Sequence, residues 1–332
     1  MFTTQMAYNS YQIVIGSYNV ILNGFTIRES NGNAGLSVEH SMTVSNCYFY
    51  KNNGGISHGG GIHIEGKSIV EVSNCVFVRN EGGRGGGIRG TAFCSLDVSN
   101  CLFIKNKYGN SGGGIHSEGT LWLDNCTFYG NSAWTGWYSE GGGLYHSWDQ
   151  ATITNCIFWN NSARDGGNEI FSPDWGGEVS ISYSNIENSN GSGSSWDTDL
   201  GSDGGGNIDL DPLFADTIND DYHLHHDSGC INAGDPAFVP EPGEVDMDGE
   251  TRIRLGRLDM GADEAGSNPA DFDESGLVNL VDFSILAAAW MSEFNGAGWN
   301  VLCDISERAD DVINMLDLAV YSGEWLWEAP WY

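Results

Sequence analysis

The sequence predicts a mainly β chain in which a parallel β-helix precedes a small α-helical module that binds calcium. Three observations carry this prediction. A block of residues recurs five times, each copy alternates with the period of two that marks β-strands, and an acidic segment near the C-terminus has EF-hand ligand spacing. We assign residues 1–264 to the β-helix with an atypical acidic terminal coil, and residues 265–332 to a paired half-EF-hand module.

The repeat is built around the dipeptide Asn-Cys. In each copy a Phe lies two residues after the Cys, an Asn follows three residues later, and Gly-Gly-Gly plus an aliphatic residue separates most copies. Asn tolerates a left-handed backbone at a sharp bend, and stacked Asn side chains can bond along a stack. We therefore expect three short strands per turn, the pattern of a parallel β-helix. The copies begin at Asn46, Asn74, Asn100, Asn125 and Asn155, and weaker copies lie at 22–27 and 179–186.

The cysteines of the repeat should point inward, one above the other. Neighbouring strands are ~4.8 Å apart, whereas a disulfide needs Cβ atoms ~3.8 Å apart. A straight stack also cannot surround a zinc ion tetrahedrally. We therefore expect a ladder of buried free thiols, formed by Cys47, Cys75, Cys101, Cys126 and Cys156.

Charge is distributed unevenly along the 332 residues. The net charge of −32 comes from 45 acids and 13 bases, and residues 1–180 contribute only −5 of it. So few bases exclude a nucleic-acid partner, because phosphate recognition needs clustered Lys and Arg. No apolar run approaches the ~20 residues of a transmembrane helix. The remaining acids lie in the terminal coil and the C-terminal module, where ligand spacing favours cation binding.

The first calcium loop is a twelve-residue segment with oxygen side chains at positions 1, 3, 5, 9 and 12 and Gly at position 6. Position 12 is Asp rather than the usual Glu, which implies a modified geometry. An apolar helix follows the loop. The expected ligands are Asp271, Asp273, Ser275, the Leu277 carbonyl, Asn279 and Asp282.

A second copy of this loop and helix lies 35 residues further on, and its start departs from the pattern. An insertion of two residues would leave a weaker second site, so we expect two calcium ions in all. The expected ligands are Asp304, Asp310, the Val312 carbonyl, Asn314 and Asp317.

Two such half-EF-hands resemble a type I dockerin module over residues 268–328. This resemblance implies folding on calcium and binding to a cohesin-like domain or surface anchor. The Asn-Cys blocks resemble the right-handed β-helix repeats of bacterial surface proteins, and residues 207–262 are similar to the ends of secreted planctomycete β-helix proteins. Both resemblances imply an extracellular or cell-surface location. Because residues 1–20 already resemble a strand and contain no signal peptide, we expect a truncated start or a misassigned start Met.

Residues just after the glycine turns should point outward and stack as His63, Arg89, His116 and Tyr145. A polysaccharide lyase needs a base and a group that neutralises a uronate, so His63, Arg89 and His116 are candidate catalytic residues. The alternative is a solvated ladder of polar side chains without catalysis. Glycosidase acids cannot be identified from spacing, since their separation in space decides the mechanism.

Aromatic residues cluster in one long loop and just beyond it. Exposed Trp and Tyr side chains suit a glycan-binding groove, whereas the alternative is burial beneath a loop. The candidate carbohydrate-binding residues are Trp134, Trp137, Tyr138 and Trp148.

We therefore expect a secreted or surface β-helix protein with a calcium-dependent tether that binds or processes extracellular polysaccharide. The alternatives are a polysaccharide lyase or glycoside hydrolase, and a non-catalytic adhesin or structural solenoid. The sequence leaves open whether the chain is an enzyme.

Overall fold

The computed structural model of the chain contains two compact units, which we describe separately. The first unit comprises Met1–Pro212 and Gly229–Glu264, and the second comprises Leu213–Ser228 and Ala265–Tyr332. The residues that the structure describes are 13–15, 18–135, 138–225, 227–246, 249–253, 256–265, 270, 272, 278, 280–293, 296, 298, 300, 303, 305 and 312–323.

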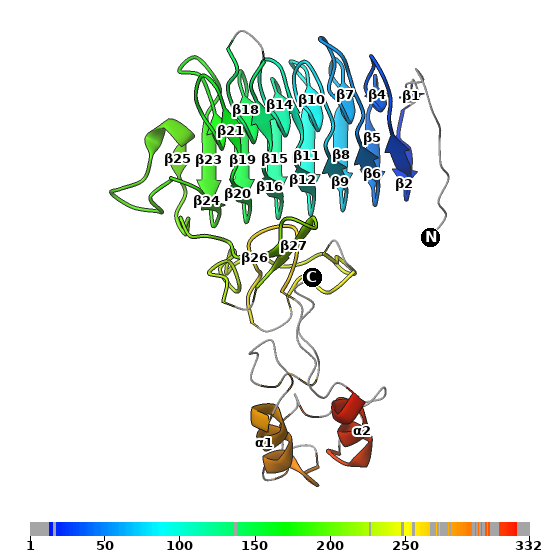
Figure 1. Cartoon of the computed structure of the whole chain (residues 1–332), viewed down its shortest axis with the longest axis vertical. Coiled ribbons are helices and arrows are strands. Elements are labelled where there is room, and N and C mark those ends of the chain that lie inside the picture. The colour runs from blue at the N-terminus through cyan, green and yellow to red at the C-terminus, as the bar shows by residue number, and fades with distance from the viewer. Residues whose placement is uncertain are drawn as a thin grey trace. The chain divides into compact units, whose positions relative to one another are not determined.

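The first unit is a parallel β-solenoid of about seven turns (Figure 1). Each turn contributes one strand to each of three sheets, which we number in the order in which the chain crosses them. Sheet 1 contains β1 (Ile13–Ile15), β4 (Leu36–Val38), β7 (Ile62–Ile64), β10 (Ile88–Gly90), β14 (Ile115–Ser117), β18 (Leu144–His146) and β22 (Ile170–Phe171). Sheet 2 contains β2 (Val20–Asn23), β5 (Met42–Ser45), β8 (Ile69–Ser73), β11 (Ser95–Ser99), β15 (Thr120–Asp124), β19 (Ala151–Thr154), β23 (Val179–Ser182) and β25 (Ser202–Asp203).

Sheet 3 carries the Cys-x-Phe blocks of the repeat. It contains β3 (Thr26–Arg28), β6 (Tyr48–Tyr50), β9 (Val76–Val78), β12 (Leu102–Ile104), β16 (Thr127–Tyr129), β20 (Ile157–Trp159) and β24 (Asn185–Ile186). A small parallel sheet contains β13 (Lys107–Tyr108), β17 (Ser132–Ala133) and β21 (Ser162–Ala163). The predicted three strands per turn are therefore confirmed.

The register aligns equivalent residues of successive copies. Phe103, for example, pairs with Phe77 on one side and with Phe128 on the other. The five stacked phenylalanine rings are nearly parallel, with centroids 4.3–4.7 Å apart. The five cysteines of the repeat are buried beside them and carry free thiols, as the sequence predicts. The other three cysteines, whose state the sequence leaves open, are free thiols as well.

Two sets of asparagines shape each turn. The Asn before each repeat Cys has a left-handed backbone with φ between 50° and 55°, which allows the sharp bend between sheets 2 and 3. The Asn after each Phe is buried and forms a ladder. In that ladder, Asn80 donates from its backbone nitrogen and from Nδ2 to Oδ1 of Asn106, both at 3.0 Å. The ladder members are Asn52, Asn80, Asn106, Asn131 and Asn161.

The third glycine of each Gly-Gly-Gly turn lies directly against the phenylalanine stack. A Cβ atom at Gly114 would come within 2.9 Å of the Phe128 ring, so only glycine fits there. In the last full turn Ile186 replaces the Phe, and Glu169 replaces this glycine. The smaller Ile leaves room for the Glu169 side chain, which enters the interior and binds Asn161.

The C-terminal part of the first unit closes the solenoid and then returns along it. The short 3-10 helix η1 (Thr198–Leu200) and β25 form an incomplete last turn. The returning segment packs on sheet 3, where the Gly261 nitrogen donates to the Asn155 carbonyl at 2.7 Å. It carries the fully buried Arg252, whose Nη2 lies 3.4 Å from Oε1 of Glu264.

The second unit contains a hairpin and two short helices. The hairpin consists of β26 (Phe214–Asp216) and β27 (Asp221–Leu224), and the helices are α1 (Leu280–Ala289) and α2 (Met315–Gly323). A small core includes Phe272 and Tyr321, whose rings stack with centroids 6.1 Å apart. Among the described residues, no helix is both long and apolar enough to cross a membrane.

Candidate functional site

The outer face of sheet 1 carries the predicted stack of functional side chains. Arg89 pairs in register with His63 in the preceding turn and with His116 in the following turn, and His116 pairs with Tyr145. The predicted register is therefore confirmed. Both histidines are nonetheless buried, at 2–3% exposure, because loops and neighbouring side chains cover this face.

His116 belongs to a hydrogen-bonded cluster with defined protonation. Its Nδ1 lies 2.9 Å from the Ser111 hydroxyl, and its Nε2 lies 3.1 Å from Oε1 of Glu118. Burial lowers the pKa of His116 to about 4, whereas the hydrogen bond from His116 lowers the pKa of Glu118 to about 2. At neutral pH a neutral imidazole therefore donates from Nε2 to an ionised carboxylate and accepts the Ser111 hydroxyl at Nδ1.

Arg84 completes this cluster. Its Nη1 lies 3.0 Å from Oε1 of Glu118, so one carboxylate oxygen accepts from both Arg84 and His116. Both ring nitrogens of His116 are engaged, and its Nε2 holds the Glu118 carboxylate in place. The arrangement suits the binding of a polar ligand.

A cavity of about 590 Å³ opens above this cluster. Arg84, His116 and Glu118 line it together with five aromatic residues. The Tyr145 ring stacks on His116 with centroids 4.8 Å apart, and the Trp148 and Trp175 rings meet edge to face at 5.9 Å. The aromatic residues that line the cavity are Tyr138, Tyr145, Trp148, Phe171 and Trp175.

Trp148 is held in a costly conformation at this site. Its φ of 82° is left-handed, which is rare for a bulky side chain, and its side chain is 69% exposed. Such strain costs about 1–3 kcal/mol and concentrates at functional sites. Phe93, in the corresponding turn between β10 and β11, is also exposed and left-handed, so this turn accepts the conformation in more than one copy.

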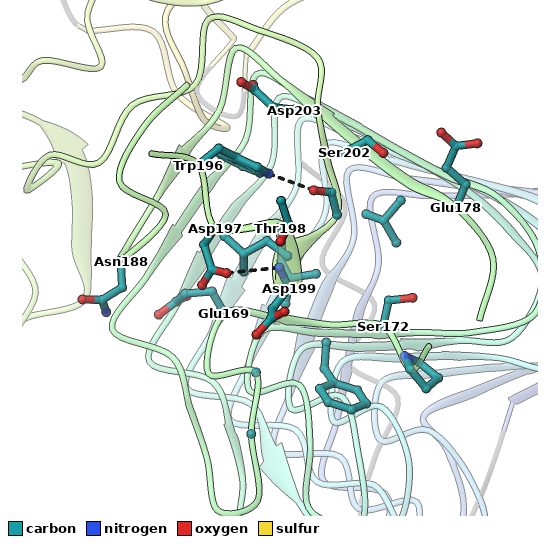
Figure 2. Close-up of a pocket in the computed structure, with 18 of the residues that line it drawn as sticks. Glu169, Ser172, Glu178, Asn188, Trp196, Asp197, Thr198, Asp199, Ser202 and Asp203 are labelled. Carbon is teal, nitrogen blue, oxygen red and sulfur yellow. Dashed lines mark hydrogen bonds between the residues drawn. The ribbon is translucent and has the colours of Figure 1, made fainter. Parts of the chain in front are cut away.

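A second hollow of about 1170 Å³ adjoins the first at the C-terminal end of the solenoid. The two share Phe171, Pro173 and Trp175 as lining residues, and we call the two hollows together the sheet 1 groove. Figure 2 shows the acidic wall of the second hollow around η1. Two hydrogen bonds order this wall, from Trp196 Nε1 to the Gly201 carbonyl and from the Asp199 nitrogen to Asp197 Oδ1. The carboxylate residues that line it are Glu169, Asp174, Glu178, Glu187, Asp197, Asp199 and Asp203.

The predicted carbohydrate-binding residues separate in the structure. Tyr138 and Trp148 line the sheet 1 groove, whereas Trp134 donates from Nε1 to the Ser162 hydroxyl and does not line it. Trp137 lies outside the described residues.

The sequence analysis did not single out Arg84 or Trp175. Arg84 lies in a glycine-rich turn and reaches the site because its backbone bridges to Ser111 of the next turn. Trp175 lies in a non-repeating loop after β22, where no periodic signal could have indicated its position.

Each of the two loops predicted to bind calcium places one buried carboxylate near the start of a helix. Asp282 Oδ1 accepts from the Phe272 nitrogen at 2.6 Å, and Asp317 Oδ1 accepts from the Ile305 nitrogen at 2.8 Å. These equivalent bonds span 10 and 12 residues, which agrees with two inserted residues in the second loop.

A capping box orders the end of the second loop. Asn314 Oδ1 accepts from the Leu316 nitrogen, and Asp317 Oδ2 accepts from the Asn314 nitrogen, both at 2.8 Å. The Val312 carbonyl accepts from Asn314 Nδ2 at 3.0 Å. The remaining predicted ligands lie outside the described residues: Asp271, Asp273, Ser275, Leu277, Asn279, Asp304 and Asp310.

Comparison with known proteins bears on the solenoid. No curated protein is similar enough to the chain to count as a relative. The family described as "Right handed beta helix region" matches residues 7–158 and 60–198, which together span more than half of the chain. The protein thus belongs to the right-handed β-helix family, as its stacked three-strand turns also indicate.

Proposed function

We propose that the solenoid binds an extracellular polysaccharide along the sheet 1 groove. The carrying observation is the aromatic wall of Tyr145, Trp148 and Trp175 above the Arg84–Glu118–His116 cluster. Flat aromatic faces pack against the apolar faces of sugar rings, while a few fixed polar groups select their hydroxyls. The two hollows draw their lining from successive turns of the solenoid, which suits a chain of sugars.

The charge of the groove favours a neutral glycan over a polyuronate. Six acidic residues line the second hollow besides Glu169, whose raised pKa keeps it protonated at neutral pH, and no Lys or Arg is among the described residues that line it. Ionised carboxylates would repel the carboxylates of uronic acids. Both ring nitrogens of His116 are already hydrogen-bonded, to Ser111 and to Glu118. This favours a role in binding a ligand over a role as the base of a lyase.

We further propose that residues 265–332 form a dockerin-like tether that folds around two calcium ions. Asp282 and Asp317 supply oxygen ligands at equivalent positions, and the Val312 carbonyl and the Asn314 amide belong to the second loop. Hard cations prefer such oxygen donors. The implied partner is a cohesin-like domain or surface anchor, and the implied location is extracellular or at the cell surface.

Glycan binding is tested with the full chain on an array of neutral and acidic polysaccharides, followed by calorimetry on any ligand found. Trp148→Ala and Trp175→Ala should each weaken binding by at least about 1 kcal/mol, or roughly fivefold. Trp134→Ala is the matched control, because this exposed tryptophan does not line the groove. Equal affinity of all three variants and the unmodified protein would refute the proposed groove.

The strain at Trp148 gives a second test that separates binding from folding. Trp148→Gly removes the side chain at a position where glycine adopts the left-handed backbone without strain. We expect this variant to lose binding while its unfolding temperature stays the same or rises. A marked loss of stability would instead assign Trp148 a structural role.

A further inference from the structure

A cluster of His58, His63 and Glu65 lies on the outer face of sheet 1, in the turn that contains β7. Each residue offers one ligand atom, and these atoms all lie within 4.8 Å of one another. None of the three is among the described residues that line the sheet 1 groove. We propose that the cluster binds a divalent transition-metal ion of the zinc class, with a fourth coordination position left for water.

The distances suit a shared ion. His63 Nε2 lies 3.2 Å from Glu65 Oε1. Two ligand atoms bound tetrahedrally to zinc at ~2.0–2.1 Å are themselves about 3.3 Å apart. The His58 ring stands perpendicular to that of His63, at 89°, with centroids 4.8 Å apart, so it approaches the pair from a different direction.

His63 is 3% exposed and its Nε2 faces Glu65, so an ion beside this carboxylate would be bound through Nε2. The other ring nitrogen, Nδ1, has no hydrogen-bond partner among the described residues and takes no part in the coordination. Glu65 is about half exposed, which gives an ion a path from solvent.

The backbone holds all three residues in place before any ion binds. His63 lies on β7, which is paired with a strand on each side. The His58 carbonyl accepts from the Gly83 nitrogen at 3.1 Å, and the Glu65 nitrogen donates to the Val38 carbonyl at 2.9 Å. Arg89 Nη1 donates to the Ser57 carbonyl and so fixes the loop beside His58. Such preorganisation lowers the cost of assembling a metal site.

The donor set selects the class of metal. Two imidazole nitrogens and one carboxylate oxygen suit zinc and neighbouring transition metals, whereas calcium and magnesium prefer oxygen ligands alone. Three protein ligands with one open position are typical of zinc sites that hold a water molecule. The positive charge of the nearby Arg89 disfavours the binding of a dication, and the negative charge of the Glu65 carboxylate offsets this repulsion.

The comparison with β14 shows why the site is specific to one turn. His116 and Glu118 have the same His-x-Glu spacing as His63 and Glu65. However, the Ser111 hydroxyl is hydrogen-bonded to Nδ1 of His116, and Arg84 donates to Glu118. That pair is already satisfied by protein groups. The pair in β7 has an additional histidine beside it instead.

The test uses the full chain, stripped with a chelator and returned to calcium-containing buffer so that oxygen-only sites elsewhere are filled. Zinc binding is measured by calorimetry and cobalt binding by absorption spectroscopy. We expect one ion per chain and a cobalt spectrum typical of nitrogen and oxygen ligands. His58→Ala and Glu65→Gln should each weaken affinity more than tenfold, whereas His40→Ala, a histidine stacked on Tyr18, should leave it unchanged.

Three outcomes would overturn the proposal. They are no binding of zinc or cobalt at micromolar concentration, equal affinity in His58→Ala and the unmodified protein, and a sulfur-to-cobalt charge-transfer band that assigns the ion to cysteines. Circular dichroism of each variant, matched to the unmodified protein, ensures that a loss of binding reports the site rather than unfolding.

Discussion

Glu169 ends the asparagine ladder of the solenoid by taking the place of the next Asn. Its Oε1 accepts from the Asn161 nitrogen at 3.1 Å, while Nδ2 of Asn161 donates to Oε2. Every inner ladder Asn instead donates to the amide oxygen of the Asn in the following turn. The carboxyl group therefore caps a buried polar stack at the end where the repeat stops.

This cap predicts a pH dependence of stability. Burial raises the pKa of Glu169 from its ordinary value of 4.5 to about 8. The folded state therefore keeps a proton that the unfolded state releases, so this group's contribution is complete below pH 4.5 and is lost as the pH rises towards 8. The loss amounts to a few kcal/mol, on the order of 1.4 kcal/mol per pKa unit.

Glu169→Gln tests this dependence, because glutamine is uncharged and keeps an oxygen that accepts from Asn161. Urea unfolding at several pH values should give a shallower decline between pH 5 and pH 8 in the variant than in the unmodified protein. Parallel pH profiles of the two proteins would contradict the assignment to Glu169.

Substitution of an asparagine in the middle of the ladder should lower the stability of the protein more than substitution of an asparagine outside it. Asn106→Ala removes the acceptor for the Asn80 nitrogen and Nδ2 and the donor to the Phe77 carbonyl. Leaving these buried groups unpaired should lower the free energy of unfolding by about 2–4 kcal/mol. Asn33→Ala is the control, since Asn33 is only partly buried and lies outside the ladder, and it should change stability by less than about 0.5 kcal/mol.

The thiols of the cysteine ladder should react slowly with alkylating reagents in the folded protein. The repeat cysteines are at most 2% exposed, and burial raises the pKa of Cys101 and Cys156 well above the ordinary thiol value. Because the thiolate is the reactive form, iodoacetamide should label these thiols slowly in buffer and rapidly in denaturant. Mass spectrometry of the labelled peptides measures this, and rapid labelling of the native protein would contradict it.

Calcium should stabilise the second unit of the chain. Addition of calcium to the full chain should raise the unfolding temperature of this unit, and a chelator should reverse the effect. Asp282→Ala and Asp317→Ala should each reduce the shift, because each removes a buried carboxylate at a loop end. Asp216→Ala, in the hairpin, should retain the full shift. No response to calcium in the unmodified chain would rule out the proposed tether.

The charge of the sheet 1 groove predicts selectivity among glycans. We expect binding of neutral polysaccharides and rejection of polyuronates, most clearly at low salt, where repulsion is least screened. The double variant Asp174→Asn and Asp199→Asn removes two lining carboxylates and should raise the affinity for polyuronates. Affinity electrophoresis at two salt concentrations measures the difference. Tighter binding of polyuronates than of neutral glycans by the unmodified protein would reverse this interpretation.

The repeat pattern alone is enough to specify the solenoid and its register. Each Asn-Cys block must stack on the next, because Cys101 and Phe103 can be buried only where the preceding and following copies offer Cys75, Phe77 and their counterparts. A one-residue slip would turn these side chains to the solvent. The same regularity requires His63, Arg89 and His116 to lie on one outer face.

The tertiary structure determines which side chains on the outer face of sheet 1 are buried and which line the groove. His116 becomes a buried, fully paired side chain because Ser111 and Glu118 meet it. The groove exists because Trp175, in a loop outside the repeat, reaches Trp148. The conformation of a loop depends on tertiary contacts, which the repeat pattern of the sequence does not predict. The aromatic wall and the contact between His58 and His63 are therefore apparent only in the tertiary structure.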